Sequence, residues 1–222
     1  MPQMPKNKLL VIATRNAGKT REFARLFEPL GIEVRNLSDY PDIPDIVEDG
    51  DTFAANSLIK AKAVSDIIGE TTLADDSGLC VDALDGRPGV YSARFAGIGA
   101  SDADNNAKLL HELNQLAESD RLAAQMAATG GGASARLLSP ARFVCALTLY
   151  SRTSPPLQSE GACEGYIIDA PRGTEGFGYD PLFYVPALGR TLAELALSQK
   201  NEISHRSKAM DKLLELIRIG QN

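Results

Sequence analysis

The stretch Arg142-Phe143-Val144-Cys145-Ala146-Leu147-Thr148-Leu149-Tyr150 decides the fold of this chain. It is almost continuously apolar, whereas a strand with one face in water alternates between apolar and polar residues. A short continuous apolar run is typical of a strand that is buried on both faces. We therefore expect residues 142–150 to form a central strand, and we expect residues 161–168 to pair beside it.

Strands and helices alternate on the N-terminal side of this stretch. Hydrophobic periodicity predicts strands at 8–13, 32–37 and 71–74, and it predicts helices between Lys19 and Gly31, at 52–68 and at 101–116. A capping box of Thr191 and Glu194 starts a short helix, and a helix at 204–219 closes the chain. This order predicts an α/β fold, bordering on α+β, in which helices flank a mixed β-sheet.

Length and composition suit a soluble protein. The chain has 222 residues, of which 44% are hydrophobic and 23% charged, and its formal net charge is -6. An acidic chain is poorly suited to broad binding of nucleic acid or an anionic membrane, and no apolar run is long enough to span a bilayer. Its three cysteines lie in apolar or glycine-flanked segments, which indicates buried thiols in a reducing compartment. Because the start lacks a signal-peptide pattern, we expect a cytoplasmic protein.

Residues 117–140 differ in composition from the rest of the chain. They are rich in alanine and contain Gly130-Gly131-Gly132. This composition predicts a flexible surface insertion. We expect the insertion to interrupt a single domain that covers residues 1–222.

Leu73-Ala74-Asp75-Asp76-Ser77-Gly78 carries the strongest chemical signal. Two adjacent carboxylates follow an apolar run, and like charges so close together need a compensating cation. Mg²⁺ prefers carboxylate oxygens and keeps waters that leave room for substrate phosphates. An aspartate here can bind such a metal ion and accept a proton from attacking water. The alternative is an Asx-turn at the end of a strand.

Ala13-Thr14-Arg15-Asn16-Ala17-Gly18-Lys19-Thr20 lies between an expected strand and an expected helix. The N–H groups at a helix start attract phosphate, and Lys19 adds a full positive charge. The segment is similar to a P-loop, but Ala13 replaces the first glycine of that motif. A capped helix start with an exposed lysine is an equal alternative.

Glu48-Asp49-Gly50-Asp51-Thr52-Phe53 precedes the helix that carries Lys60. Glu48 is a candidate to join Asp76 on a metal ion, whereas Asp51 or Thr52 is suited to capping the helix. Lys60 is a candidate substrate contact, and a solvated surface lysine is the alternative.

Two later segments supply groups for a flat ligand. Three glycines surround Phe177, so the backbone can approach a base on which Phe177 stacks and to which Asp180 offers an acceptor. The alternative for Tyr179 is a position in the core. Lys200, His205 and Arg206 lie around the start of the last helix, where cations are unfavourable unless an anion or an acceptor is bound. This conflict favours a binding role for all three.

Together and in this order, the segments resemble the inosine triphosphate pyrophosphatase family, from about residue 9 to residue 212. The matching motifs are T-R-N-A-G-K, E-D-G-D-T-F, L-A-D-D-S-G-L with P-G-V-Y-S-A-R, G-F-G-Y-D-P and S-H-R. The resemblance implies an elongated mixed sheet with two lobes around a central cleft, and it implies a homodimer. Ala55-Asn56-Ser57 departs from the Glu-Asn-Ala that the family often carries, which would leave the metal to Asp75, Asp76 and Glu48.

The resemblance also assigns roles to residues. Asp76 would accept the proton in catalysis and, with Glu48, would bind Mg²⁺. Ser77 and the loop from Thr14 to Lys19 would contact the triphosphate, and the later segments would hold the base. The candidate substrate-binding residues are Thr14, Arg15, Asn16, Ala17, Gly18, Lys19, Lys60, Ser77, Phe177, Gly178, Tyr179, Asp180, Lys200, His205 and Arg206.

The implied activity is Mg²⁺-dependent hydrolysis of purine nucleoside triphosphates with non-standard bases, namely ITP, dITP, XTP and dXTP. Cleavage between the α- and β-phosphates would release a nucleoside monophosphate and pyrophosphate. Donors from Lys200, His205 and Arg206 suit a 6-oxo purine, whereas adenine would set an amino group against them. Three alternatives stay open: a pyrophosphatase for pyrimidine or modified nucleotides, a P-loop-type NTPase that releases orthophosphate, and a non-catalytic nucleotide-binding module.

Overall fold

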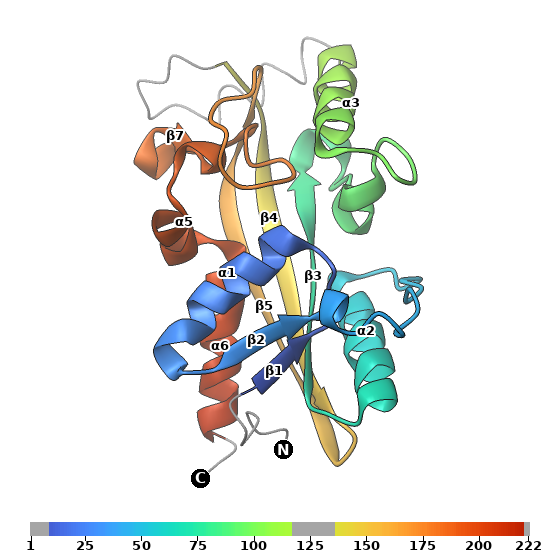
Figure 1. Cartoon of the computed structure of the whole chain (residues 1–222). Helices are drawn as coiled ribbons and strands as arrows, with labels where there is room; N and C mark the ends of the chain where they lie inside the picture. Colours follow the sequence, from blue (N-terminus) through green and yellow to red (C-terminus); the bar gives the residue numbers. More distant parts are fainter. Residues whose placement is uncertain (1–8, 117–135, 220–222) are drawn as a thin grey trace. The chain divides into compact units, whose positions relative to one another are not determined.

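The computed structural model describes residues 9–116 and 136–219, and it contains a seven-stranded sheet with flanking helices (Figure 1). The strand order is β2-β1-β3-β4-β5-β6-β7. The chain divides into two compact units. Unit 1 comprises Met1–Ser77, Cys145–Ala162 and Ile203–Asn222, and unit 2 comprises Gly78–Val144 and Cys163–Glu202.

The sheet is mixed, as the order of predicted elements indicates. β1 pairs in parallel with β2 and with β3, whereas β6 pairs antiparallel with β5 and with β7. β4 is the fourth of the seven strands and β5 lies next to it, which confirms the expected central pair. The strands are β1 (Leu9–Ile12), β2 (Glu33–Asn36), β3 (Thr72–Val81), β4 (Leu137–Ser151), β5 (Ser154–Ile168), β6 (Phe183–Val185) and β7 (Arg190–Thr191).

Helices α1, α2, α3 and α6 follow the sequence periodicity, whereas α5 is not predicted from the sequence. Gly31 and Gly69 adopt left-handed conformations, with φ of 63° and 77°, and each caps a helical segment at its C-terminus. No helix in the described parts of the chain is long and apolar enough to cross a membrane. The α-helices of these parts are α1 (Ala17–Phe27), α2 (Phe53–Ile68), α3 (Asp102–Gln115), α5 (Leu197–Ile203) and α6 (His205–Ile219).

β4 begins earlier than the sequence suggests. Its first residue is Leu137, so residues 137–140 belong to the strand and not to the insertion expected at 117–140. Ser139 makes this segment look like a loop, but its hydroxyl accepts a hydrogen bond from the N–H of Ala83 at 3.1 Å and donates one to the carbonyl of Pro140 at 2.7 Å. A buried serine is tolerated in a strand when its hydroxyl is satisfied in this way. Residues 117–135 of the expected insertion lie outside the described residues.

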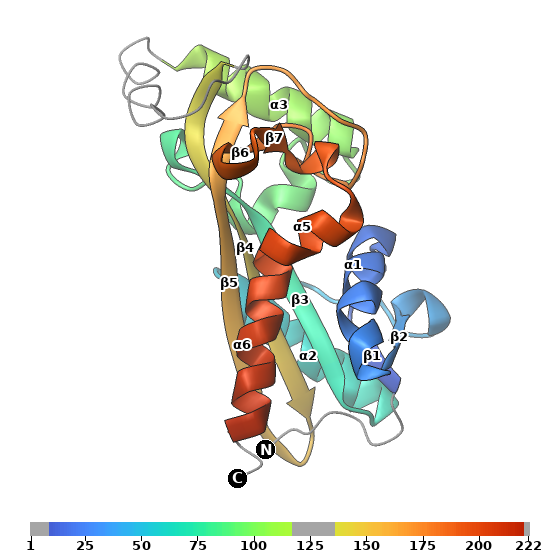
Figure 2. The same ribbon diagram turned by 90° about the vertical axis from the view of Figure 1, so that its left-hand side faces the viewer.

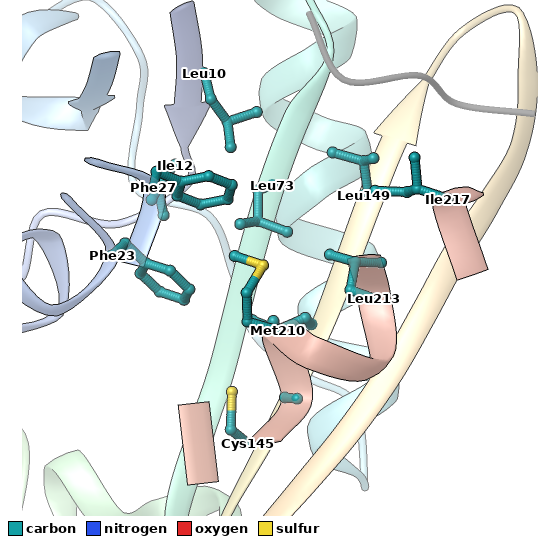
Figure 3. Close-up of a cluster of buried hydrophobic side chains, with 12 residues drawn as sticks. Leu10, Ile12, Phe23, Phe27, Leu73, Cys145, Leu149, Met210, Leu213 and Ile217 are labelled. Atoms are coloured by element: carbon teal, nitrogen blue, oxygen red, sulfur yellow. The ribbon is translucent and has the colours of Figure 1, made fainter. Parts of the chain in front are cut away.

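In unit 1, helices cover both faces of the strands. Helices α1 and α6 lie on one face, and α2 lies on the other (Figures 1 and 2). In Figure 3, Met210 and Leu213 of α6 lie beside Leu73 of β3. The α1–α6 core consists of Leu10, Ile12, Phe23, Phe27, Leu73, Cys145, Leu147, Leu149, Ala209, Met210, Leu213 and Ile217. The α2 core consists of Val11, Ala13, Leu37, Ile43, Ala61, Val64 and Ala74.

The acidic pair lies within a strand, not at the end of one. β3 runs without interruption from Thr72 to Val81, so the expected strand end at Ala74 is wrong. Successive side chains of a strand point to opposite faces, and accordingly Leu73 belongs to the α1–α6 core while Ala74 belongs to the α2 core. Asp75 and Asp76 continue this alternation. The strand therefore passes through two adjacent acids without bringing them to the same face.

Helix α6 approaches β5 closely at Gly161. A Cβ atom on Gly161 would lie 2.3 Å from the carbonyl oxygen of His205 and 2.4 Å from the backbone nitrogen of Ala209. The Ser159 hydroxyl donates to the carbonyl of Ala209 at 2.7 Å, which ties the same two elements together. Only glycine permits this approach, because the atoms that a side chain would meet belong to the backbone of α6.

We expect Gly161→Ala to destabilise the protein by about 1–3 kcal/mol, because the added methyl group must displace a helix backbone. Glu160→Ala is the matched control, since Glu160 precedes it on β5 and is exposed. That control should change the free energy of unfolding by less than about 0.5 kcal/mol. Urea unfolding of the three proteins measures both effects, and equal stabilities would show that α6 does not rest on this glycine.

Candidate active site

Asp75 lies at the centre of a buried ionic network in unit 1. Its side chain is fully buried. The Lys19 ammonium of α1 donates to Oδ1, and the Arg206 Nε of α6 donates to Oδ2 at 3.0 Å. Arg206 also donates through Nη1 to Glu22 Oε2 at 2.7 Å. The order Glu22, Arg206, Asp75, Lys19 alternates in sign, so each charge on this face of β3 has a neighbour of opposite charge.

Two further donors reach the same carboxylate. The Ser77 hydroxyl donates to Asp75 Oδ2 at 2.8 Å, and the Cys145 thiol lies 3.1 Å from the same oxygen. Burial would raise the pKa of Asp75, but Arg206 and Lys19 hold its pKa well below the ordinary value. Burial raises the pKa of the Cys145 thiol. At physiological pH Asp75 is therefore an anion and Cys145 a neutral thiol.

Asp76 faces the opposite side of β3 and meets a different cation. Lys60 of α2 donates to Asp76 Oδ1 at 3.0 Å and lies 2.8 Å from Glu48 Oε2. Lys60 is only 7% exposed, so the alternative of a solvated surface lysine is wrong. Lys60 and Asn56 are one helical turn apart, and the carboxamide of Asn56 accepts the N–H of Gly50 at 2.8 Å. This contact fixes the loop that delivers Glu48.

The two oxygens of Asp76 differ in their surroundings. Oδ1 binds Lys60, whereas Oδ2 is buried and accepts no hydrogen bond from the described residues. Burial raises the pKa of Asp76, and the cations Lys60 and Lys19 oppose this effect only in part. Burial of Glu48 acts in the same direction, but Lys60 outweighs it and lowers the pKa of that carboxylate. The more buried carboxylate is thus the more basic one, as a proton acceptor requires.

The loop from Thr14 to Lys19 is a capped helix start. Asn16 is the N-cap of α1, and its side chain accepts the N–H of Lys19 at 3.0 Å. Arg15 pairs with Asp45 at 2.9 Å. Ala13 is buried in the α2 core, so the position of the missing P-loop glycine is a packing position. A capped helix start does not rule out a phosphate-binding role. The Lys19 ammonium pairs with Asp75 and is only partly buried, so it lies at the edge of the ionic network around Asp75.

A second group of candidate residues comes together in unit 2. Lys200 of α5 donates to Asp180 Oδ2 at 2.6 Å, and its ammonium lies 4.8 Å from the centroid of the Phe177 ring. The same Asp180 oxygen accepts the N–H of Phe177 at 2.9 Å. Tyr179 is buried and donates to the carbonyl of Ser92 at 2.9 Å, which agrees with a core position for its ring.

Lys200, His205 and Arg206 do not belong to the start of one helix. Lys200 belongs to α5, whereas α6 begins at His205. Two of the three have a carboxylate of the chain as acceptor: Asp180 for Lys200, and the pair Asp75 and Glu22 for Arg206. No bound anion is therefore needed to explain the positions of Lys200 and Arg206.

Sequence reasoning missed Glu22, Asn56 and Cys145 as members of this site. Glu22 follows Lys19 by three residues and is 2% exposed. A glutamate among the core-facing positions of an amphipathic helix indicates that a buried cation pairs with it. Asn56 precedes Lys60 by four residues, so both lie on one face of α2. Nothing in the sequence around Cys145 points to its contact with Asp75.

Glu48 and Asp76 fit a hard divalent cation. Both carboxylates contact Lys60, and Asp76 Oδ2 is a buried oxygen without a hydrogen bond from the described residues. No group of three metal-binding side chains occurs in the parts of the chain that the structure describes. Two carboxylates suit Mg²⁺, which uses one or two protein carboxylates and completes its shell with water and substrate phosphates.

Comparison with known proteins agrees with this geometry. The pattern that defines the Ham1 family matches residues 10–216. The chain belongs to the Ham1 family. A dITP/XTP pyrophosphatase of Geobacillus kaustophilus is 51% identical over 208 residues, which cover 94% of this chain and 93% of that protein. A dITP/XTP pyrophosphatase of Streptococcus thermophilus is 47% identical over 96% of this chain, but the chain spans only 61% of that longer relative.

Solved structures of Ham1 proteins share the fold. The Ham1 protein of Staphylococcus aureus has a TM-score of 0.75 at 38% identity, over 96% of this chain and 100% of that one. A HAM1 protein of Coxiella burnetii has a TM-score of 0.77 at 38% identity, over 95% and 98%. These likenesses confirm the resemblance that the motifs indicate, and they confirm the fold class.

We expect Asp75→Asn to lower the free energy of unfolding by about 3–5 kcal/mol at pH 7, because it leaves buried cations without their central anion. The folded-state pKa of Asp75 lies well below its unfolded value. Its stabilising effect should therefore be complete above about pH 4 and disappear as the pH falls further. Urea unfolding at several pH values measures this difference.

The control for this prediction is Asp66→Asn. Asp66 pairs with Lys62 at 2.7 Å on the surface of α2, and both side chains are well exposed. Loss of such a pair should cost less than about 1 kcal/mol. If Asp75→Asn were no more harmful than Asp66→Asn, the ionic network would not be a stabilising element.

Proposed function

We propose that this protein hydrolyses purine nucleoside triphosphates with non-standard bases, ITP, dITP, XTP and dXTP, to the nucleoside monophosphate and pyrophosphate. The observation that carries the proposal is the Glu48–Lys60–Asp76 cluster in a chain that is 51% identical to a dITP/XTP pyrophosphatase. A buried basic carboxylate beside a lysine suits the deprotonation of water next to a polyanion. Such an enzyme would remove these nucleotides from the nucleotide pool.

Asp76 is the proposed proton acceptor. Its Oδ2 is buried and lacks a hydrogen bond from the described residues, while Lys60 holds Oδ1 in place. A carboxylate oxygen in this state can orient a water molecule and take its proton during in-line attack on the α-phosphorus. Lys19 and Lys60 are the cations that can offset the charge of the triphosphate, together with the N–H groups at the start of α1.

Mg²⁺ is the proposed cofactor, bound by Glu48 and Asp76. When bound, it supplies positive charge to the phosphate oxygens and to the leaving pyrophosphate. Lys60 already contacts both carboxylates. We propose that this lysine keeps the two carboxylates close together and that its ammonium also contacts the phosphates of the substrate.

Phe177, Gly178, Tyr179, Asp180, Lys200 and His205 are the proposed base-recognition residues. Phe177 offers a ring for stacking, and the Lys200–Asp180 pair offers both a donor and an acceptor to the base edge. Arg206 is bound to Asp75 and Glu22. We therefore propose that Arg206 acts by holding Asp75 and, through it, Lys19.

The remaining parts of the proposal concern the assembly and its setting. The resemblance to the inosine triphosphate pyrophosphatase family supports a homodimer. All three cysteines are thiols, which is consistent with a reducing cytoplasm. Neither the net charge of -6 nor the ionic site favours a nucleic-acid partner.

Product analysis tests the proposed activity. Incubation of the protein with ITP and Mg²⁺ should release pyrophosphate and IMP, and ITP and XTP should react faster than GTP, ATP or TTP. Orthophosphate as the primary product would support a P-loop-type NTPase instead. Faster hydrolysis of TTP than of ITP would support a pyrophosphatase for pyrimidine or modified nucleotides.

We expect Asp76→Asn to lower kcat by about 10²–10⁴, the usual contribution of a positioned general base. Asp82→Asn is the control, because Asp82 follows the same strand and its side chain is half exposed in a surface pair with Arg142. The control should keep the activity of the unmutated protein. Initial rates of pyrophosphate release measure both variants, and an unchanged rate for Asp76→Asn would indicate a non-catalytic nucleotide-binding protein.

Glu48→Gln should raise the Mg²⁺ concentration that gives half-maximal activity by about tenfold or more, because a charged ligand is replaced by a neutral one. Asp49→Asn is the matched control, since the neighbouring Asp49 is exposed. Rates measured over a range of Mg²⁺ concentrations distinguish the two variants. Identical metal dependence in both would remove Glu48 from the metal site.

A further inference from the structure

Helix α3 makes two hydrogen bonds to Gly178, the residue after Phe177 in the loop. Asp102 Oδ2 accepts the N–H of Gly178 at 2.7 Å, and Asn106 Nδ2 donates to the carbonyl of the same residue at 2.9 Å. Asp102 and Asn106 are four residues apart, so they lie on one face of the helix. Because a carbonyl only accepts, the Asn106 atom at this contact is the amide nitrogen. Both backbone polar groups of Gly178 are therefore held by one helix.

We propose that Asp102 and Asn106 are positioning residues that set the discrimination between purine bases by fixing the Phe177 ring. This inference rests on the proposed function of the Phe177 loop as the base-recognition segment. It adds to that function two residues that determine base specificity. Both lie on α3, a helix outside all of the sequence motifs for nucleotide binding. All of the residues involved belong to unit 2.

Phe177 is fixed by its backbone on both sides. Its own N–H donates to Asp180 Oδ2 at 2.9 Å, and the next residue is the Gly178 that α3 holds. Gly178 has φ of 63°, a conformation that favours glycine and that sets the direction of the chain after the ring. Gly176 has φ of 80°, and a Cβ there would lie 2.1 Å from Asp180 Oδ2. The loop thus fits closely around Asp180.

The position of the Phe177 ring also determines its distance from a buried cation. Lys200 and Asp180 are each only 2% exposed and are paired at 2.6 Å, so this buried ion pair is held by its surroundings when the less buried Phe177 and Gly178 move. The ring centroid lies 4.8 Å from that ammonium. If the contacts to Gly178 were lost, the ring would shift relative to Lys200 and Asp180. A base stacked on the ring would then meet the donor and the acceptor at a different place, which weakens discrimination more than binding in general.

Asp102 has no capping role in its own helix. The N-cap of α3 is Ser101, which forms a capping box with Asp104: the Asp104 side chain accepts the Ser101 N–H at 2.9 Å, and Ser101 Oγ accepts the Asp104 N–H at 3.2 Å. Asp102 and Asp104 thus sit two residues apart in the first turn, with one carboxylate directed to the loop and the other to the helix end. This division supplies a matched control within a single turn.

The experiment compares Asp102→Ala, Asn106→Ala, Asp102→Asn and the control Asp104→Ala. The readouts are kcat and KM for ITP, XTP, GTP and ATP, the melting temperature, and the hydrogen exchange of a peptide that covers residues 174–181. We expect Asp102→Ala and Asn106→Ala to reduce the ratio of kcat/KM for ITP over ATP by about tenfold. Exchange at the loop should be faster in both. Asp102→Asn should recover most of the ratio, because its amide oxygen can still accept the Gly178 N–H.

Asp104→Ala should lower the melting temperature, because it removes the acceptor of the Ser101 N–H from the capping box, while it leaves both the base ratio and the loop exchange as in the unmutated protein. The proposal is overturned if Asp102→Ala and Asp104→Ala give the same base ratio. It is equally overturned if loop exchange is unchanged in Asp102→Ala, a result that does not depend on any enzymatic activity. If the unmutated protein released pyrophosphate from none of the four nucleotides, that result would instead contradict the proposed function.

Discussion

The pleat of β3 is the constraint on which the site depends. Asp75 and Asp76 are adjacent in sequence, and on one face their charges would repel each other at close range. The strand directs them to opposite faces, where Asp75 meets Lys19 and Arg206 and Asp76 meets Lys60. A shift of the register by one residue would exchange these partners and turn Leu73 and Ala74 away from their cores. Core packing and charge pairing therefore fix the same register.

The two acids differ in how completely they are neutralised. Asp75 has cations on both oxygens and further donors from Ser77 and Cys145, so its pKa stays low although it is fully buried. Asp76 has one oxygen on Lys60 and one buried oxygen without a hydrogen bond from the described residues, and burial raises its pKa. Two chemically identical groups thus become an anion of lowered pKa and a more basic carboxylate, the proposed proton acceptor. Such separation by environment is how active sites assign distinct roles to neighbouring carboxylates.

The sequence predicts most elements because their signals are local. The apolar run at 142–150, the stop at Gly31 and the capping box at Thr191 depend on nearby residues only. The prediction that a strand ends at Ala74 is wrong. Charged residues are a poor sign of a strand end when the residues that neutralise them come from helices distant in sequence. The pairing of Arg206 with Glu22 joins residues from α6 and α1, and no local pattern specifies it. The motifs named the candidate residues, but only the fold shows which cation pairs with which acid.

Three lysines that were expected to face a nucleotide are already bound to aspartates: Lys19 to Asp75, Lys60 to Asp76 and Lys200 to Asp180. A long flexible side chain loses much conformational freedom when it is ordered, and here this loss occurs during folding and not when the substrate binds. The ammonium groups are therefore pre-oriented, as electrostatic catalysis requires. The same pairing keeps each lysine charge locally balanced, so that none of the three is an exposed cation that attracts anions indiscriminately. An acidic protein can in this way carry lysines that suit the proposed polyanionic substrate.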